Sequence, residues 1–521
     1  MSSAFEPALL DGARRPSSQV RIETILCIAF ATVAIATQVW QPFVLGFYHD
    51  DWALFVQPRL HPADTWFFGP SNPDRPGFAL LTKAIVTLWN GEPATLHLMK
   101  IAITSSACAA IALTALTYQR AFGVTSPALA ISGAAFWLVA PWSLGYSLWP
   151  TAAFANMAVL LLGVSTIALE RWIATRAFAA LILSVLTYAA SLSFYQSTWL
   201  AIFPFLAILG LRDVWQRRPS RPAIIAFVLL GAVQIAAAAQ SFLSSPKAPN
   251  PQVVHLFLEN LKRVSKLGVS AFGSTGNNLM LAAVGCALLV VCLRAWSRGP
   301  QSRIRLIGGV LLFLSGIGAT SAVYAAANYG FDTVGVFSRT TQMVNVWIAI
   351  AGALLFAPPP GDESRVRYIG PALSLAIVVA CCAAYWPAAR PWLRSWEMQR
   401  AILDKTGPLA AQVRDGDVVL TNVPVQVDGV TVFGAPWDIT AAFLVKNATT
   451  LPQLAYRTPS IQIVPFGPLD MSWTPGKFTV MPGWTIDAKR LLVWNWRTGA
   501  ISTVDHPVAT QDELGALFSP D

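Results

Sequence analysis

Long apolar runs fill the first 390 residues of this chain, and they constrain its fold more than any other feature. A helix that crosses a membrane needs about 20 predominantly apolar residues in a row. The runs lie at about 22–46, 95–118, 126–146, 152–170, 177–194, 196–212, 222–242, 278–296, 304–327, 342–357 and 369–389. Only 12% of all residues are charged, whereas a soluble protein has about 25%. The sequence therefore predicts a polytopic α-helical membrane protein with about 11 transmembrane helices.

Arginines gather in every second connection between these runs, while the short connections near 147–151 and 195 have none. The basic set is Arg14, Arg15, Arg21, Arg120, Arg171, Arg176, Arg212, Arg217, Arg218, Arg221, Arg294, Arg298, Arg303, Arg305, Arg365 and Arg367. Because cytoplasmic loops collect Lys and Arg, we expect a cytoplasmic N-terminus, a first run that is retained as a span, and a bacterial inner membrane location. The net charge of +10 then reflects topology, and no nucleic-acid partner is expected.

Three outer loops follow from this layout, at 47–94, 243–277 and 328–341. Residues 77–90 are apolar but short, and Lys83 interrupts them, so we expect a helix lying at the outer interface. A crossing there would turn every later arginine cluster outward. Residues 254–264 carry apolar side chains at i, i+3, i+4 and i+7, which predicts an amphipathic helix on the outer leaflet.

The composition changes near residue 390, so we divide the chain into a membrane domain, 1–390, and an extracytoplasmic domain, 391–521. A helix is expected to leave the membrane there. Short β-type runs follow, separated by Gly, Pro, Asp and Asn: VVLTNV, VTVFGA, IQIVPF, FTVMPG and RLLVWNW. They predict a small mixed α/β domain. The 6 cysteines all lie in apolar runs, so neither a disulfide framework nor a cysteine metal site is expected.

Two adjacent acids, Asp50 and Asp51, stand where the first apolar run ends, in the sequence YHDDW. An ionisable side chain near a bilayer is costly and is therefore a functional candidate. Two acids in a loop can also simply be solvated. Here His49 and Trp52 flank them, and Arg75 follows in the same outer loop.

These residues resemble motifs of the GT-C superfamily of membrane glycosyltransferases, especially the branch with the protein O-mannosyltransferases. The family places an acidic motif after its first span, here HDDW, and a basic or RP motif at the start of an interfacial helix, here DRPG. LHLMK opens the second span, and a Trp- and Pro-rich turn precedes the fourth. The resemblance covers about residues 22–350 and lies in the order of these elements. Relatives often carry a further acid after the third span, but SLWPT here has none.

The resemblance implies transfer of a sugar from a polyprenyl-phosphate donor to an acceptor hydroxyl on a glycan, lipid or protein at the outer face, with inversion. Asp50 or Asp51 is the expected general base. The donor phosphate is expected on Arg75, Lys100 and Arg339, although such residues also serve as interfacial anchors. Expected substrate contacts are His49, Trp52, Asp74, His97, Tyr146 and Trp149.

A divalent cation held by Asp50 and Asp51 is a further option, since some members of the family bind one there, and His49 could join as a ligand. The alternative function is a polytopic transporter or lipid flippase, and an assembly scaffold is a third. Transporters keep ionisable groups near the bilayer midplane, in symmetric halves. Here the runs are almost free of acids and the polar groups gather on one face, which favours chemistry at the outer interface.

Overall fold

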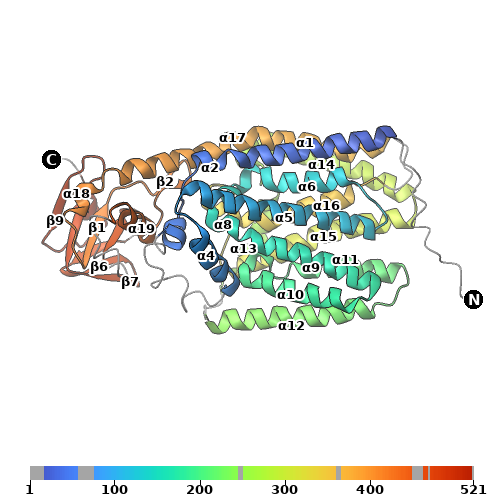
Figure 1. Cartoon of the computed structure of the whole chain (residues 1–521), viewed down its shortest axis with the longest axis horizontal. Coiled ribbons are helices and arrows are strands. Elements are labelled where there is room, and N and C mark those ends of the chain that lie inside the picture. Colours follow the sequence, from blue (N-terminus) through green and yellow to red (C-terminus); the bar gives the residue numbers. More distant parts are fainter. Residues whose placement is uncertain are drawn as a thin grey trace, which may run out of the picture.

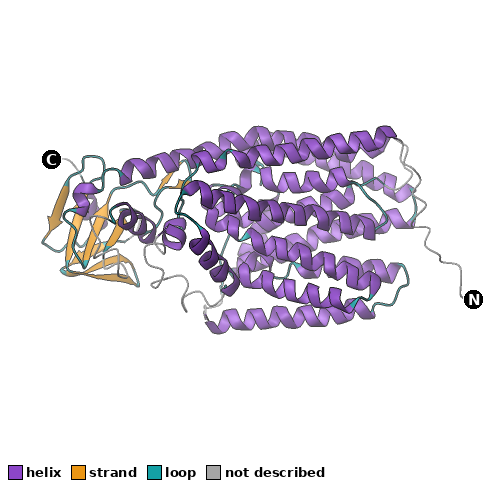
Figure 2. Ribbon diagram, in the orientation of Figure 1, coloured by secondary structure: helices purple, strands orange, loops and turns teal. Residues whose placement is uncertain are grey.

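The computed structural model describes residues 17–56, 75–244, 250–358, 365–448, 461–467 and 470–518. Its helices run roughly along the long axis of the molecule, and the strands gather at one end (Figure 1, Figure 2). We call the end of the helical bundle beside the strands the strand end, and the other end the far end. α1 starts at the far end, and the last long helix, α17, leads into the strands.

Within the described residues, 8 segments are long and apolar enough to cross a membrane. Their helices are α1 (Ser17–Val39), α5 (Pro93–Ala121), α9 (Asn156–Thr175), α11 (Ile202–Trp215), α12 (Arg221–Ser244), α14 (Val269–Ser297), α15 (Pro300–Ala326) and α17 (Ile369–Leu403). The remaining predicted runs form shorter helices: α6 (Pro127–Val139), α10 (Phe178–Phe194) and α16 (Gln342–Leu355). A multi-pass helical membrane protein is thus confirmed, while a count of eleven spans stays a prediction.

Short helices fill the connections. They are α2 (Gln41–Val44), α4 (Pro76–Leu88), α7 (Gly145–Leu148), α8 (Pro150–Phe154), α13 (Val253–Val264), the π-helical turn η1 (Trp52–Val56), and the 3-10 turns η2 (Pro141–Ser143), η3 (Gln196–Thr198), η4 (Gly335–Thr341) and η5 (Arg365–Tyr368). α4 and α13 confirm the helices predicted at 77–90 and 254–264. Proline opens α4, as it opens several long helices, because its fixed φ suits the first turn and its missing N–H is not needed there.

Two helices differ from the predicted boundaries. α14 begins at Val269 rather than 278, and the left-handed Gly273 (φ 69°) divides its first turn from the rest. α17 continues for 35 residues through Pro387 and Pro391, past the predicted end at 389. Proline is tolerated in membrane helices where neighbouring groups satisfy the freed backbone. The expected exit helix is therefore the last part of the final long helix.

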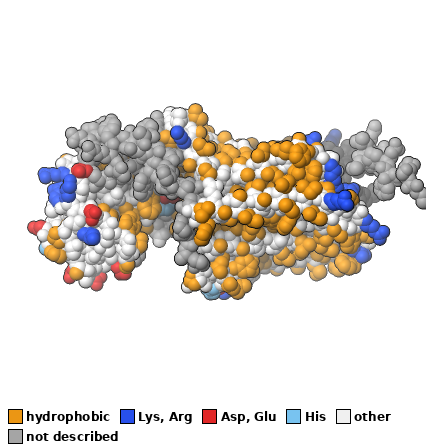
Figure 3. All heavy atoms as spheres, turned by 90° about the horizontal axis from the view of Figure 1, so that it is seen from below, with side chains coloured by type: hydrophobic (Ala, Val, Ile, Leu, Met, Phe, Trp, Pro, Cys, Tyr) orange, Lys and Arg blue, Asp and Glu red, His pale blue; other side chains and the backbone are white. Residues whose placement is uncertain are grey.

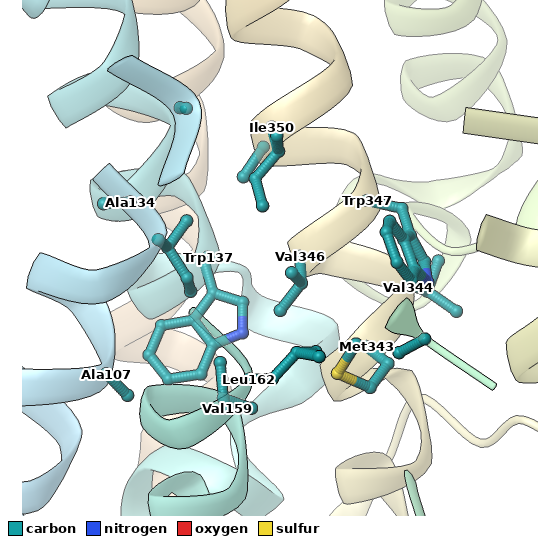
Figure 4. Close-up of a cluster of buried hydrophobic side chains, with 14 of the residues drawn as sticks. Ala107, Ala134, Trp137, Val159, Leu162, Met343, Val344, Val346, Trp347 and Ile350 are labelled. Carbon is teal, nitrogen blue, oxygen red and sulfur yellow. The ribbon is translucent and has the colours of Figure 1, made fainter. Parts of the chain in front are cut away.

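The bundle has a tightly packed centre and a lipid-like periphery. Trp137 of α6, Val159 of α9 and Val346 of α16 meet in the buried centre (Figure 4). Small residues let helices approach: a Cβ on Gly163 would lie 2.8 Å from the Cβ of Ala110. The most apolar part of the segment Pro150–Thr175 is 72% buried, whereas that of Val269–Ser297 is only 11% buried. The outer helices therefore present apolar side chains outward.

Apolar side chains cover the face of the bundle that the space-filling view shows (Figure 3). Lys and Arg side chains collect at the far end of that face, and Asp and Glu appear over the strand-bearing part. This distribution is the one that positive-inside sorting produces when the far end is cytoplasmic. The orientation itself stays a prediction.

The C-terminal part is a mixed α/β structure, as predicted. Its elements are α18 (Gly407–Ala410), β1 (Asp417–Thr421), β2 (Gln426–Val427), β3 (Val430–Thr431), α19 (Pro436–Lys446), β4 (Gln462–Pro465), β5 (Ser472–Thr474), β6 (Gly476–Met481), β7 (Trp484–Ala488), β8 (Arg490–Trp494), β9 (Ile501–Val504) and α21 (Gln511–Ala516). The main sheet has the order β4-β1-β8-β9, in which β1 pairs in parallel with β4 and β8. α19 lies between the parallel strands β1 and β4 in the chain, as in a crossover connection.

The strand-bearing part and the first outer loop share one apolar core. Phe47 and Phe55 from the loop belong to the same buried cluster as Phe433, Ile439 and Phe443 from α19 and the chain before it. Fully burying one such side chain contributes about 1.5–3 kcal/mol relative to leaving it exposed. The loop that carries the two acids is therefore packed against α19.

Candidate active site

A cavity of about 220 Å³ lies at the strand end of the bundle. Its polar and aromatic lining comes from separate segments and includes Asp50, Arg75, Trp149, Tyr195, Tyr324 and Arg339. The acid follows α2, Arg75 caps the start of α4, Trp149 lies between α7 and α8, and Arg339 lies in η4. Cavities that combine apolar walls with a few convergent polar groups are typical of ligand sites. The tertiary structure thus brings together four residues that the sequence analysis had singled out.

The backbone turn at the dyad sends its two carboxylates to different places. His49 adopts a left-handed conformation (φ 44°), which is uncommon for a residue other than glycine. The turn closes on itself, because the Asp51 N–H donates to the Tyr48 carbonyl (3.0 Å) and the Tyr48 N–H donates to Asp51 Oδ2 (2.8 Å). Asp50 then lines the cavity, and Asp51 does not.

Asp51 is fully buried and holds two segments together. Its Oδ1 accepts hydrogen bonds from the Thr151 N–H (2.9 Å) and hydroxyl (2.6 Å), at the start of α8. Burial raises the pKa of Asp51 to about 7, although the hydrogen bonds from Thr151 and Tyr48 oppose that rise. Both carboxylate oxygens are therefore engaged in structural contacts.

Asp50 is more accessible, with a side chain that is 26% exposed. Its Oδ1 accepts a hydrogen bond from the indole N–H of Trp437 (3.0 Å) and lies 3.7 Å from His49 Nε2. On the other side of the ring, His49 Nδ1 lies 2.7 Å from Asp438 Oδ2. Burial lowers the pKa of His49, but the Asp438 and Asp50 carboxylates outweigh it and raise the pKa to about 9.

His49, Asp50 and Asp438 could also hold a metal ion. One ligand atom from each lies within 4.8 Å of the others. Among the described residues, the buried Asp438 Oδ1 has no hydrogen-bond partner. One imidazole and two carboxylates are a donor set that suits a divalent transition metal. This set differs from the predicted pair, since Asp51 is engaged with Tyr48 and Thr151 and lies outside the cluster.

The two guanidinium groups at the cavity are held by neighbouring residues in the connections between helices. Arg75 donates to Gln196 Oε1 through Nη2 (2.8 Å) and Nε (3.2 Å), and its guanidinium lies 5.1 Å from the centre of the Tyr195 ring. Arg339 donates to the Val336 carbonyl (3.0 Å) and lies 5.0 Å from the centre of the Trp149 ring. Such cation–π contacts fix the direction of each guanidinium group.

Four other predicted site residues are buried near this end of the bundle without lining the cavity: Trp52, His97, Lys100 and Tyr146. Trp52 donates to Gln399 (2.8 Å), and a nitrogen of His97 lies 2.9 Å from the Gly46 carbonyl. Lys100 bonds Gln41 and the Leu148 carbonyl, while Tyr146 bonds the Trp137 carbonyl. These contacts give each of them a structural role. Asp74 lies outside the described residues.

Sequence reasoning missed several residues at the site. Tyr195, Gln196 and Tyr324 contact or line the cavity, and Trp437 and Asp438 approach the dyad from α19. The last two stand in APWDIT, where Pro436 marks a helix start. Nothing in that segment alone connects it to a residue almost 400 positions earlier.

Comparison with known proteins gave no family model and no curated protein that matches the chain. Among solved structures, ArnT from Cupriavidus metallidurans bound to undecaprenyl phosphate aligns at 11% identity with a TM-score of 0.43, over 82% of this chain and 89% of that one. The same protein in the apo state gives 11% identity and a TM-score of 0.43, over 86% and 90% of the two chains.

Proposed function

We propose that the chain is a membrane glycosyltransferase of the GT-C type that transfers a sugar from a polyprenyl-phosphate donor to an acceptor hydroxyl at the outer face. One observation carries this proposal: a carboxylate, Asp50, and two guanidinium groups, Arg75 and Arg339, line one cavity at the end of an apolar helical bundle. A lipid-linked donor needs a site where its tail can lie in the bilayer and its phosphate at the interface. The motif resemblance described above supports the same activity.

Asp50 is the general base of the proposed reaction. An oxygen of its carboxylate takes the proton of the acceptor hydroxyl as that oxygen attacks C1 of the sugar. The bond between C1 and the phosphate oxygen breaks through an oxocarbenium-like transition state, and the electron pair leaves with the lipid phosphate. A single displacement of this kind inverts the configuration at C1. Asp51 is the weaker candidate, because Tyr48 and Thr151 occupy both of its oxygens.

Arg75 and Arg339 bind the donor phosphate and stabilise the negative charge that develops on it. The Arg339 guanidinium lies over the ring of Trp149, and this cation–π contact holds it in place. A divalent cation, if bound, would be held by His49, Asp50 and Asp438 and would supply further positive charge to the site. The acceptor hydroxyl belongs to a glycan, a lipid or a protein.

The test is turnover of a panel of radiolabelled polyprenyl-phosphate sugars by the purified chain in proteoliposomes, supplied with envelope glycans, lipids and proteins. The expected result is release of free polyprenyl phosphate together with labelled acceptor. Asp50→Asn should lower turnover by about 10²–10⁴-fold. The control is Asp505→Asn, the same change at a side chain that is 94% exposed.

Undiminished turnover in Asp50→Asn would contradict the role of the base. Movement of an intact lipid between leaflets, with no covalent change to any donor in the panel, would instead favour the transporter or flippase alternative.

A further inference from the structure

α19 of the strand-bearing part reaches the two residues that precede Asp51. The indole N–H of Trp437 donates to Asp50 Oδ1 (3.0 Å), and Asp438 Oδ2 lies 2.7 Å from His49 Nδ1. The ring centres of Trp437 and His49 are 6.4 Å apart. Neither α19 residue lines the cavity. Both therefore act through His49 and Asp50 rather than by lining the cavity themselves.

The position of α19 is itself fixed by its surroundings. Thr440 Oγ1 accepts a hydrogen bond from the Ile463 N–H (2.9 Å), which ties the helix to β4. Asn447, directly after the helix, donates to Thr406 Oγ1 (2.9 Å) beyond the end of α17. Ile439 and Phe443 are buried in the core shared with the first outer loop. A helix held by these contacts can place a hydrogen-bond donor with the precision of about 0.5 Å that an active site needs.

We propose that Trp437 and Asp438 are positioning residues, through which the C-terminal part completes the active site by fixing Asp50 and His49 in their working orientation. This inference rests on the proposed function, because it assigns these residues to the same reaction. If these residues position Asp50 and His49, the C-terminal part contributes to the active site and is not a separate accessory domain.

The local backbone explains why such support is needed. His49 is held in a left-handed conformation, which is uncommon for a residue other than glycine. The Asp438 carboxylate anchors His49 through the ring nitrogen Nδ1, and the Trp437 indole N–H binds one carboxylate oxygen of the neighbouring Asp50. A strained turn persists only where its surroundings determine it. Without these contacts, Asp50 would sample other orientations, and a displacement of about 1 Å can lower a rate about 100-fold.

The expected signature separates positioning from binding. The partners identified for Arg75 and Arg339, which would hold the donor phosphate, lie outside α19: Gln196 in η3, Trp149 before α8 and Val336 in η4. Loss of a positioning contact should therefore lower kcat while the KM for the donor changes little. A merely structural role would lower the amount of folded protein and leave the kcat of the folded fraction unchanged.

The experiment measures kcat, donor KM and melting temperature for Trp437→Phe and Asp438→Asn in the full-length chain. Trp437→Phe keeps the ring and removes only the indole N–H. The expected result is a kcat that is about 10–100-fold lower, as for other contacts that orient a reacting group, with a donor KM within about threefold of the wild type. The matched controls are Trp484→Phe, which changes the ring next to Trp437, and Asp505→Asn.

Several outcomes would overturn the inference. The inference is wrong if the kcat of Trp437→Phe equals that of the wild type, and this holds even if Asp438→Asn fails to fold. A donor KM that rises as much as kcat falls would indicate direct binding instead. Stoichiometric metal in the wild-type chain, lost in Asp438→Asn, would make Asp438 a metal ligand; elemental analysis of both proteins decides this. Absence of transfer by the wild type would refute the proposed function itself. Loss of activity in Asp50→Asn, with full activity in Trp437→Phe and Asp438→Asn, would refute only the role of α19.

Discussion

The two ends of the helical bundle both present arginines beside a cavity, but they differ in what accompanies them. At the strand end, Arg75 and Arg339 share a cavity of about 220 Å³ with Asp50 and several aromatic rings. At the far end, Arg298 and Arg305 line a cavity of about 260 Å³ whose described lining contains no carboxylate. Arg305 there donates to the Ala357 carbonyl, just after α16.

Arginine clusters can therefore have two separate roles in a membrane protein of this kind: orienting the chain and binding a substrate. Arginines at the far end suffice to orient the chain by the positive-inside rule. A reaction needs more, because an acceptor proton must be removed while phosphate charge is stabilised. Of the two cavities, the one at the strand end has a carboxylate beside guanidinium groups in its described lining, and α19 contacts that carboxylate through Trp437.

The largest expected effect concerns the side of the membrane on which each end lies. A cysteine placed at Asp505, in the strand-bearing part, should react completely with a membrane-impermeant maleimide in intact cells. A cysteine at the exposed Arg218, at the far end, should react only after the membrane is opened. The unmodified chain is the control, because its cysteines lie in apolar helices. Labelling of Arg218→Cys in intact cells would reverse the orientation and remove the outer-face site.

The second prediction tests whether the two arginine sets are equivalent. Arg339→Gln should lower kcat/KM for the lipid-phosphate donor by about 10²–10³-fold, because a charged donor to the leaving phosphate is lost. Arg298→Gln, at the far end, should leave kcat/KM within about twofold. Both are measured by release of polyprenyl phosphate. Equal losses in the two variants would break the distinction between the two ends.

The smallest expected effect separates the two neighbouring acids. Asp51→Asn should lower the free energy of unfolding by about 1–3 kcal/mol, because one of the buried donors from Tyr48 and Thr151 would face an amide N–H₂. The kcat of the folded fraction should stay within about tenfold of the wild type, well above that of Asp50→Asn. Thermal unfolding and turnover of the same preparations check this. A stable but inactive Asp51→Asn would exchange the roles of the two acids.

Much of the fold followed from local sequence. Each predicted apolar run is helical, and the short helices α4 and α13 lie where periodicity and charge placed them. The boundaries differ from the prediction where a local signal was ambiguous: α14 has an extra first turn before the kink at Gly273, and α17 continues through Pro387 and Pro391. Neighbouring helices supply packing that overrides these local preferences.

The sequence by itself determined that the chain crosses a membrane repeatedly, because apolar length and arginine placement are local properties that water and lipid sort directly. It also placed Asp50, Arg75, Trp149 and Arg339 at one membrane boundary. Only the tertiary structure decided which acid faces the cavity, through the left-handed turn at His49, and brought Asp438 of α19 to that residue. Contacts between segments so far apart in the chain depend on how the core packs, and no periodicity or local motif specifies them.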